Sequence, residues 1–186
     1  MLLLRRASLA LTLAFALVVP ALHGQTAQRW SIQLSALGAE LTDVAQEDLR
    51  FGGGLEIQAR FNPSALSIGF GFQTTRHQLR NELLARDRTV TYTGGFVEPR
   101  LILGSLGDFL AFYAAARFMS LSATTEVGGV EAKIDGAGLA GGGGILIRIT
   151  DRLNAELGAT AGKEYYNRDA DTGTTVVTRL GIALGL

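Results

Sequence analysis

The chain ends in the stretch Val176 to Leu186, which reads VVTRLGIALGL. Its largest apolar side chains fall on alternate positions: Leu180, Ile182, Leu184 and Leu186. The positions between them carry small residues and one charge: Arg179, Gly181, Ala183 and Gly185. A period of two is typical of a β-strand, and a strand that is bulky and apolar on one face only suits a wall with lipid on that side. We interpret this stretch as the closing strand of a transmembrane β-barrel.

Seven earlier segments show the same alternation, which gives eight predicted strands. They span residues 30–36, 51–61, 66–73, 89–103, 110–119, 139–149 and 153–161. The segment 89–103 is the least regular, because Val90 and Tyr92 lie on one parity and Val97 lies on the other. We expect Gly94-Gly95 to form a bulge that resets the phase. An even number of strands of about 9 to 11 residues can close antiparallel and leave no unpaired edge in hydrocarbon.

The connections between these strands alternate in length. Residues 62–64, 104–108 and 150–152 are short turns, whereas polar stretches of a dozen residues or more occupy 38–50, 74–88, 120–135 and 162–173. Long loops on one rim and tight turns on the other are typical of bacterial outer-membrane barrels, with the turns in the periplasm. We expect both ends of the barrel domain on the rim of short turns.

The amino terminus reads as a secretory signal peptide. Arg5 and Arg6 form its basic region and residues 7–19 its apolar region, and we place cleavage after Gly24, with cleavage after Ala27 as the alternative. This divides the chain into a cleaved signal peptide, residues 1–24, and one barrel domain, residues 25–186. Without the two arginines, 15 basic residues would remain against 17 acidic ones. That slightly negative balance disfavours nucleic acid as a partner, and the absence of cysteine excludes a disulfide framework.

The faces opposite the apolar ones carry eight charged residues that should point into the lumen: Glu56, Arg60, Glu98, Arg100, Arg117, Arg148, Glu156 and Arg179. An eight-stranded barrel has an interior just wide enough for side chains to fill it. Unpaired charges there would be costly, so we expect a network of ion pairs that plugs the lumen. The alternative is a path for a solute or a proton, gated by rearrangement of the same ion pairs.

No catalytic, cofactor or metal site is predicted. Residues 136–141, GAGLAG, match the dinucleotide fingerprint, but that motif must open a helix, and residues 142–149 read as a strand. His77 is the single histidine of the predicted mature chain, and we place it in a solvated loop. A lone histidine without cysteine disfavours zinc. An envelope lipid hydrolase would need His77 beside a serine or an acid.

Two of the long polar stretches have candidate roles outside the membrane. Residues 78–85 could form a short amphipathic helix that caps the barrel. Tyr165-Tyr166 could recognise a surface ligand. Tyrosines just beyond a strand also fit the interfacial aromatic girdle, as do residues near other strand ends, Trp30, Phe51, Phe61, Phe72 and Phe109.

Taken together, the export signal, the eight alternating segments, the loop asymmetry and the apolar last strand resemble the small eight-stranded outer-membrane β-barrel proteins, the OmpA-like and OmpX-like class. The resemblance implies an all-β, eight-stranded antiparallel up-and-down transmembrane β-barrel with a polar, side-chain-filled lumen. It also implies a monomer in the outer membrane of a Gram-negative cell, inserted by the outer-membrane assembly machinery. Such proteins usually end on an aromatic residue, whereas this chain ends on Leu186.

The expected function is an envelope-structural or surface-interaction role without catalysis. Its partners would be outer-membrane lipid, the assembly machinery and a surface ligand bound through the long loops. A porin-like channel for small solutes and an envelope lipid hydrolase are the alternatives within this fold. A secreted soluble barrel of lipocalin type is the alternative fold, and it would turn its large apolar residues inward.

Overall fold

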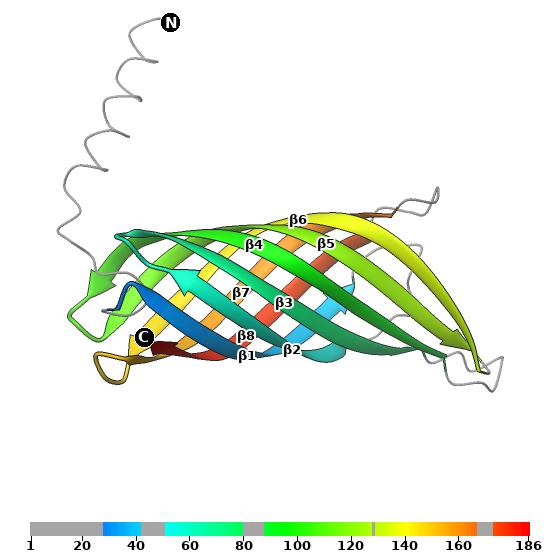
Figure 1. Cartoon of the computed structure of the whole chain (residues 1–186), viewed down its shortest axis with the longest axis horizontal. Helices are drawn as coiled ribbons and strands as arrows, with labels where there is room; N and C mark the ends of the chain where they lie inside the picture. The colour runs from blue at the N-terminus through cyan, green and yellow to red at the C-terminus, as the bar shows by residue number, and fades with distance from the viewer. Residues whose placement is uncertain (1–27, 42–50, 80–87, 128, 167–172) are drawn as a thin grey trace, which may run out of the picture.

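Eight antiparallel strands form a closed barrel in the computed structural model, which describes residues 28–41, 51–79, 88–127, 129–166 and 173–186 (Figure 1). The strands are β1 Trp30–Leu41, β2 Gly52–Phe61, β3 Leu66–Leu79, β4 Arg88–Leu106, β5 Leu110–Val127, β6 Val130–Arg148, β7 Leu153–Tyr166 and β8 Gly173–Gly185. Each strand pairs with the next in sequence. The all-β, up-and-down fold expected from the alternation is confirmed. The predicted signal peptide, residues 1–24, lies outside the described residues.

The last strand closes the ring, as its pattern predicts. β8 pairs with β1 in a continuous antiparallel register that runs from Ser31↔Gly185 to Leu41↔Thr175. The backbone N–H of Leu186 adds a hydrogen bond of 2.9 Å to the carbonyl oxygen of Trp30. Closure matters because a backbone group that faces hydrocarbon has no water to bond, so an open sheet could not span the membrane.

The three short turns lie together at one end of the barrel, beside the carboxyl terminus (Figure 1). They follow β2, β4 and β6. Gly107 takes a positive φ of 61° in the second turn, a conformation that glycine adopts without steric cost. In the third turn the Thr150 hydroxyl accepts hydrogen bonds from the backbone N–H groups of Arg152 and Leu153.

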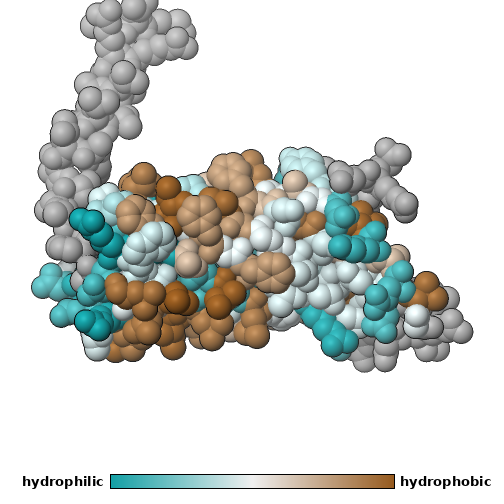
Figure 2. Space-filling model, in the orientation of Figure 1, coloured by the Kyte–Doolittle hydropathy of each residue, from teal (hydrophilic) through white to brown (hydrophobic). Residues whose placement is uncertain are grey.

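Apolar side chains cover the outer surface of the barrel nearest this end. Leu34, Phe70, Phe118 and Leu180 are each more than half exposed, which is the pattern of a lipid-facing belt and the reverse of a lipocalin-type core. On the face seen in Figure 2, hydrophobic surface forms a brown zone that gathers toward the end with the short turns, while the opposite half is paler and more polar. The described residues contain no helix long and apolar enough to cross a membrane.

The opposite ends of the strands extend further than expected. Most of the predicted loop 120–135 is strand, because β5 runs to Val127 and β6 begins at Val130, with Gly129 at a φ of 85° in the tight turn between them. The predicted loop 74–88 begins as strand, since β3 continues to Leu79. These stretches are polar but rich in β-branched threonine, which favours strands. The predicted loops 38–50 and 162–173 also begin as strand, since β1 continues to Leu41 and β7 to Tyr166. Residues 78 and 79 of the proposed helix belong to β3, while residues 80–85 lie outside the described residues, as do 42–50 and 167–172.

The expected bulge at Gly94-Gly95 is absent. The register between β3 and β4 is unbroken, and even-numbered residues of β4 point inward on both sides of these glycines. Val90 and Tyr92 are therefore interior residues, and their phase needs no reset. The register shift lies instead between β4 and β5, at Ile102 and Gly104, close to the short turn.

Candidate functional site

Glu98 on β4 is the centre of a buried cluster of charges in the lumen. Four arginines from different parts of the barrel surround its carboxylate. Arg60 and Arg100 contact Oε1 at 2.6 Å and 2.9 Å, while Arg117 and Arg179 contact Oε2, the latter at 3.4 Å. Their side chains are at most 1% exposed. One carboxylate thus links β2, β4, β5 and β8 through charge-assisted bonds.

Glu156 on β7 connects this centre to the opposite wall. Arg100 donates to both of its oxygens at 3.0 Å, which is the bidentate geometry that a planar guanidinium favours. Arg179 contacts Oε1 at 3.2 Å, and the Tyr113 hydroxyl donates to the same oxygen at 2.6 Å. The Arg100 guanidinium also lies 3.9 Å from the centre of the Tyr113 ring, so the tyrosine stabilises both charges.

Glu56 on β2 completes the cluster. Its carboxylate oxygen Oε2 lies 2.6 Å from a guanidinium nitrogen of Arg117, and Oε1 lies 3.2 Å from Nε of Arg179. Arg117 also donates to the Gln73 amide oxygen at 2.8 Å and lies 3.8 Å from the centre of the Phe96 ring. Every guanidinium of the cluster therefore contacts at least one carboxylate, and four arginines face three glutamates.

Small residues provide the space that these long side chains need. A Cβ atom on Gly158 would lie 2.2 Å from the Tyr113 hydroxyl oxygen, and one on Gly69 would lie 2.4 Å from the amide nitrogen of Gln58. A larger residue at either position would force the neighbouring polar group to shift, because that group occupies the volume of a side chain. The sequence shows these glycines on the inward parity, but it does not show which long residue each one accommodates.

The structure brings together seven of the eight predicted lumen residues. The exception is Arg148. It lies on the inward parity at the end of β6, beside a short turn, and is only partly buried. Within the described part of the chain, no ion pair joins it to the cluster. Alternation along a strand predicts whether a side chain points inward or outward, but not its level along the barrel axis. The sequence could therefore not separate Arg148 from the other seven residues.

His77 differs from its expected position in a solvated loop. It belongs to β3, is 1% exposed, and makes an edge contact with the ring of Tyr92 at 5.3 Å between ring centres. A Cβ atom on Gly52 would lie 2.5 Å from the imidazole. The histidine is thus packed inside the barrel at the end opposite the short turns, which we call the outer end. Among the described residues, no group of three or more histidine, cysteine or acidic side chains could hold a metal ion.

The outer end of the lumen combines an apolar cluster with a few buried polar side chains, among them His77, Thr75 and Glu164. Leu41, Val90 and Tyr92 form a buried cluster with Ala123 and Tyr166 packed against it. Tyr166 donates its hydroxyl to Glu164 at 2.5 Å, so only Tyr165, which is 50% exposed, keeps the outward position of a girdle or contact residue. The glycine-rich stretch 136–141 lies within strand β6, which excludes the helix that a dinucleotide site requires.

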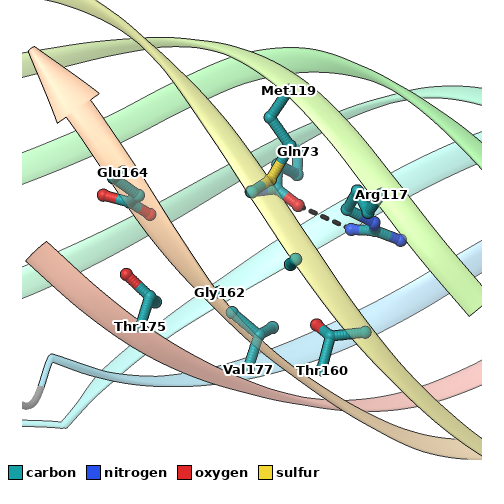
Figure 3. Close-up of a pocket in the computed structure, with 9 residues that line it drawn as sticks. Gln73, Arg117, Met119, Thr160, Gly162, Glu164, Thr175 and Val177 are labelled. Carbon is teal, nitrogen blue, oxygen red and sulfur yellow. Dashed lines mark hydrogen bonds between the residues drawn. The ribbon is translucent and has the colours of Figure 1, made fainter.

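A small cavity lies between the apolar cluster and the charges. Figure 3 shows the side chains around it: Gln73 and Arg117 are hydrogen bonded on one side, and Glu164, Thr160 and Thr175 lie on the other. The cavity has room for about one water molecule. This space between the charges and the apolar cluster is therefore the size of a water molecule and too small for a larger ligand.

Solved structures with the same architecture are small outer-membrane barrels. Neisserial surface protein A aligns with a TM-score of 0.67 and 16% identity over 84% of this chain and 97% of its own. Ail, the attachment invasion locus protein of Yersinia pestis, aligns at 0.55 and 14% over 84% and 97%. OprG, an outer membrane protein of Pseudomonas aeruginosa, aligns at 0.51 and 12% over 87% and 97%.

These comparisons identify the fold. The chain has the architecture of the small eight-stranded outer-membrane β-barrels, as the sequence pattern predicts. No family model matches the sequence, and no curated protein matches it by sequence. At such low identity the likeness concerns the fold, so the function has to be argued from the barrel itself.

Proposed function

We propose that this protein is an outer-membrane barrel that holds a β-sheet outside the cell for surface interaction, without catalysis. The observation that carries this proposal is an inversion of polarity along the strands. Near the short turns and along the middle of the barrel, large apolar residues point outward, while the charges of the cluster and a small apolar group around Ile102 and Leu146 point inward. Toward the other end, apolar residues such as Val90 and Leu121 point inward, and hydroxyl-bearing or charged residues point outward.

The inversion lies at a similar height on neighbouring strands. On β3 the outward residues change from Phe72 to Thr74, and on β5 they change from Phe118 to Ser120. Thr74 is paired with Thr93 on β4, which is paired in turn with Ser122 on β5. A surface with hydroxyl groups outside and an apolar core inside suits water and not hydrocarbon, so it supports a membrane boundary at this level.

Strand length supports the same boundary. A tilted strand needs about 9 to 11 residues to span a bilayer, whereas β4, β5 and β6 have 19, 18 and 19 residues. The excess forms what we call the outer sheet: residues 74–79, 88–94, 120–127 and 130–136. The remaining strands are shorter, so the outer sheet protrudes on one side of the barrel (Figure 1).

The ion-pair cluster and the belt would serve as the anchor of this sheet. The belt contacts outer-membrane lipid, and the cluster fixes the strands to one another through the lumen. Export through the predicted signal peptide and insertion by the outer-membrane assembly machinery would precede this state. The names of two structural neighbours, a surface protein and an attachment invasion locus protein, agree with a surface role.

Cysteine labelling in intact cells tests the proposed orientation. The chain has no cysteine, so Asp135→Cys in the outer sheet and Asp151→Cys in a short turn each introduce a single exposed thiol. A membrane-impermeant maleimide should label the Asp135→Cys variant on intact cells, and should label the Asp151→Cys variant only after the outer membrane is permeabilised. The reverse pattern would place the outer sheet in the periplasm and refute the proposal.

A further inference from the structure

The outermost part of β6 has a neighbour on one side only within the described residues. Residues 130–135 pair with β5, from Val127↔Val130 to Ser122↔Asp135. The pairing of β6 with β7 begins one residue later, at Gly136↔Tyr166. Figure 1 shows the β5–β6 hairpin continuing past the end of β7. We call residues 130–135 the β6 edge.

Half of the backbone groups of the β6 edge point toward the side on which no described strand pairs with it. The backbone N–H of Arg148 donates to the carbonyl oxygen of Phe109, the residue directly before β5. Even-numbered residues of β6 therefore turn their backbone groups toward β5. The β5–β6 register has no shift, so the alternation continues to the tip. The backbone groups of Glu131 and Lys133 therefore face away from β5, which is the geometry that accepts another strand.

The side chains of the β6 edge are also uncovered. Val130 is 72% exposed, and the side chains of Lys133 and Asp135 are 65% and 66% exposed. Lys133 and Asp135 approach each other at 3.7 Å, but an ion pair in water contributes little and does not hold the lysine in place. An exposed strand edge with a large apolar residue is a surface suited to strand addition.

The sequence of this edge is complementary to itself. When VEAKID is placed antiparallel to a second copy about Ala132, Glu131 of each copy lies opposite Lys133 of the other. Val130 lies opposite Ile134 in the same arrangement, and the two Ala132 residues face each other. Opposite charges and apolar pairs placed directly across two strands are the stabilising cross-strand combinations.

We propose that the β6 edge pairs antiparallel with the same edge of a second copy of this chain, in a symmetric contact centred on Ala132. Antiparallel pairing reverses the direction of β6, whose tip points away from the membrane in each copy. The two copies must therefore be anchored in facing membranes, and the contact joins one cell surface to another. This inference rests on the proposed function, because it requires the outer sheet to lie outside the cell.

A single contact of this kind is small. It would form about four backbone hydrogen bonds, between the Glu131 and Lys133 positions of the two copies. Many copies on each surface would act together, so adhesion between surfaces can be strong while the individual contact is weak.

Charge reversal in nanodiscs tests the pairing. Full-length barrels, one in each phospholipid nanodisc, should associate in pairs with rising concentration, as measured by sedimentation. Lys133→Glu places two glutamates opposite each other in both halves of the contact, and Glu131→Lys places two lysines opposite each other. Each variant should therefore associate roughly tenfold or more weakly than the native chain.

The mixture of the two variants is the decisive sample. Lys133→Glu nanodiscs and Glu131→Lys nanodiscs should associate with each other, because both cross-strand pairs become opposite in charge again. Lys163→Glu is the matched control, since Lys163 is an exposed lysine on the next strand and should tolerate the same change. Heat-modifiable migration on a gel checks that every variant is folded.

Three outcomes would overturn the proposal. The native nanodiscs could remain single at every concentration, the two variants could associate as well as the native chain, or their mixture could fail to restore association. A fourth measurement stands apart from affinity: with oxidised glutathione added as the oxidant, Ala132→Cys should form a disulfide between copies, because opposed residues in a non-hydrogen-bonded pair lie about 4.5 Å apart. Location of the outer sheet is measured separately by the Asp135→Cys labelling, so failure of pairing and failure of orientation are distinguishable.

Discussion

Glu98 concentrates the charge balance of the lumen in one side chain. Replacing Glu98 with alanine would leave Arg60 without its carboxylate and would weaken the positions of Arg100, Arg117 and Arg179. Breaking a buried ion pair from one side costs about 3–5 kcal/mol, because the remaining charge stays buried without a partner. We expect Glu98→Ala to lower the free energy of unfolding by that amount or more.

Urea unfolding of the refolded barrel in detergent, followed by heat-modifiable migration, measures this loss. Glu126→Gln is the control, because Glu126 is an exposed carboxylate on the outer sheet and its replacement should change stability by less than about 0.5 kcal/mol. Equal stability of the Glu98→Ala and Glu126→Gln variants would show that the cluster does not hold the barrel together.

Gly158 and Tyr113 provide a second test at the scale of single residues. Alanine at position 158 would place its Cβ 2.2 Å from the Tyr113 hydroxyl oxygen and force the ring away from Glu156. We expect Gly158→Ala to cost about 1–3 kcal/mol of unfolding free energy. Gly53→Ala should be nearly neutral, since no atom lies within 4 Å of the added Cβ.

Removing the Tyr113 hydroxyl tests whether its clash with the added methyl group causes the loss of stability in Gly158→Ala. In the background Tyr113→Phe, the substitution Gly158→Ala should cost less than it does alone, because the clashing oxygen is gone. A double-mutant cycle from the same urea titrations gives the coupling energy. Purely additive losses would mean that the glycine is needed for another reason, such as the conformation of β7.

Residue identity on alternating positions was enough to predict most of the charged cluster, but not its geometry. The parity of Glu56, Glu98 and Glu156 follows directly from the apolar residues beside them. Which arginine contacts which glutamate depends on the relative height of the strands, and that height is set by pairing registers that one strand alone does not encode. Arg148 and His77 show the limit: the first lies too near the turns, and the second lies inside a strand that looked like a loop.

At the scale of whole strands, the sequence predicted the membrane part and missed the outer part. The alternation of large apolar and small or polar residues ends at the membrane boundary proposed above, so β5 and β6 beyond Phe118 and Leu139 have the sequence pattern of loops. Their β-branched residues, Thr124, Thr125, Val130 and Ile134, still favour strand, and Leu121 lies on the inward face. Val90 and Tyr92 follow the same rule, which explains why no bulge is needed at Gly94-Gly95.

The position of this boundary leads to a test with charged substitutions on outward faces. Leu157 lies in the apolar belt of β7 and is 53% exposed, whereas Thr124 lies on the outer sheet. A lysine facing the middle of a bilayer costs about 2–4 kcal/mol, and the cost falls toward zero near the interface. We expect Leu157→Lys to destabilise the folded barrel in phospholipid vesicles by about that amount and Thr124→Lys to have almost no effect.

Folding titrations in the vesicles measure both variants against the native chain. In detergent micelles, which adapt around a charge, the difference between them should shrink. If Thr124→Lys destabilises the barrel in vesicles as strongly as Leu157→Lys does, the polar ends of the strands must lie in the hydrocarbon, and the outer sheet does not stand in water.

The filling of the lumen is a property of the whole molecule, since no single strand closes it. Small polar residues such as Ser31 and Asn154 occupy the end with the short turns, the seven-residue ion-pair cluster occupies the middle, and the apolar group around Tyr92 occupies the outer end. An ion that crosses would have to separate buried ion pairs and then displace the packed side chains of Leu41, Val90 and Tyr92, and both steps are costly.

We therefore predict that the native barrel does not conduct. In planar bilayers it should show no sustained discrete openings, and raising the salt concentration should not create them, because buried ion pairs are screened far less than exposed ones. The matched sample is a barrel with Glu98→Ala and Tyr92→Ala together, which removes the centre of the cluster and part of the apolar closure while leaving the belt intact. If this variant folds and conducts while the native chain stays closed, the lumen side chains are the plug. Stable unitary currents from the native chain would instead favour passage of small solutes through a cluster that rearranges.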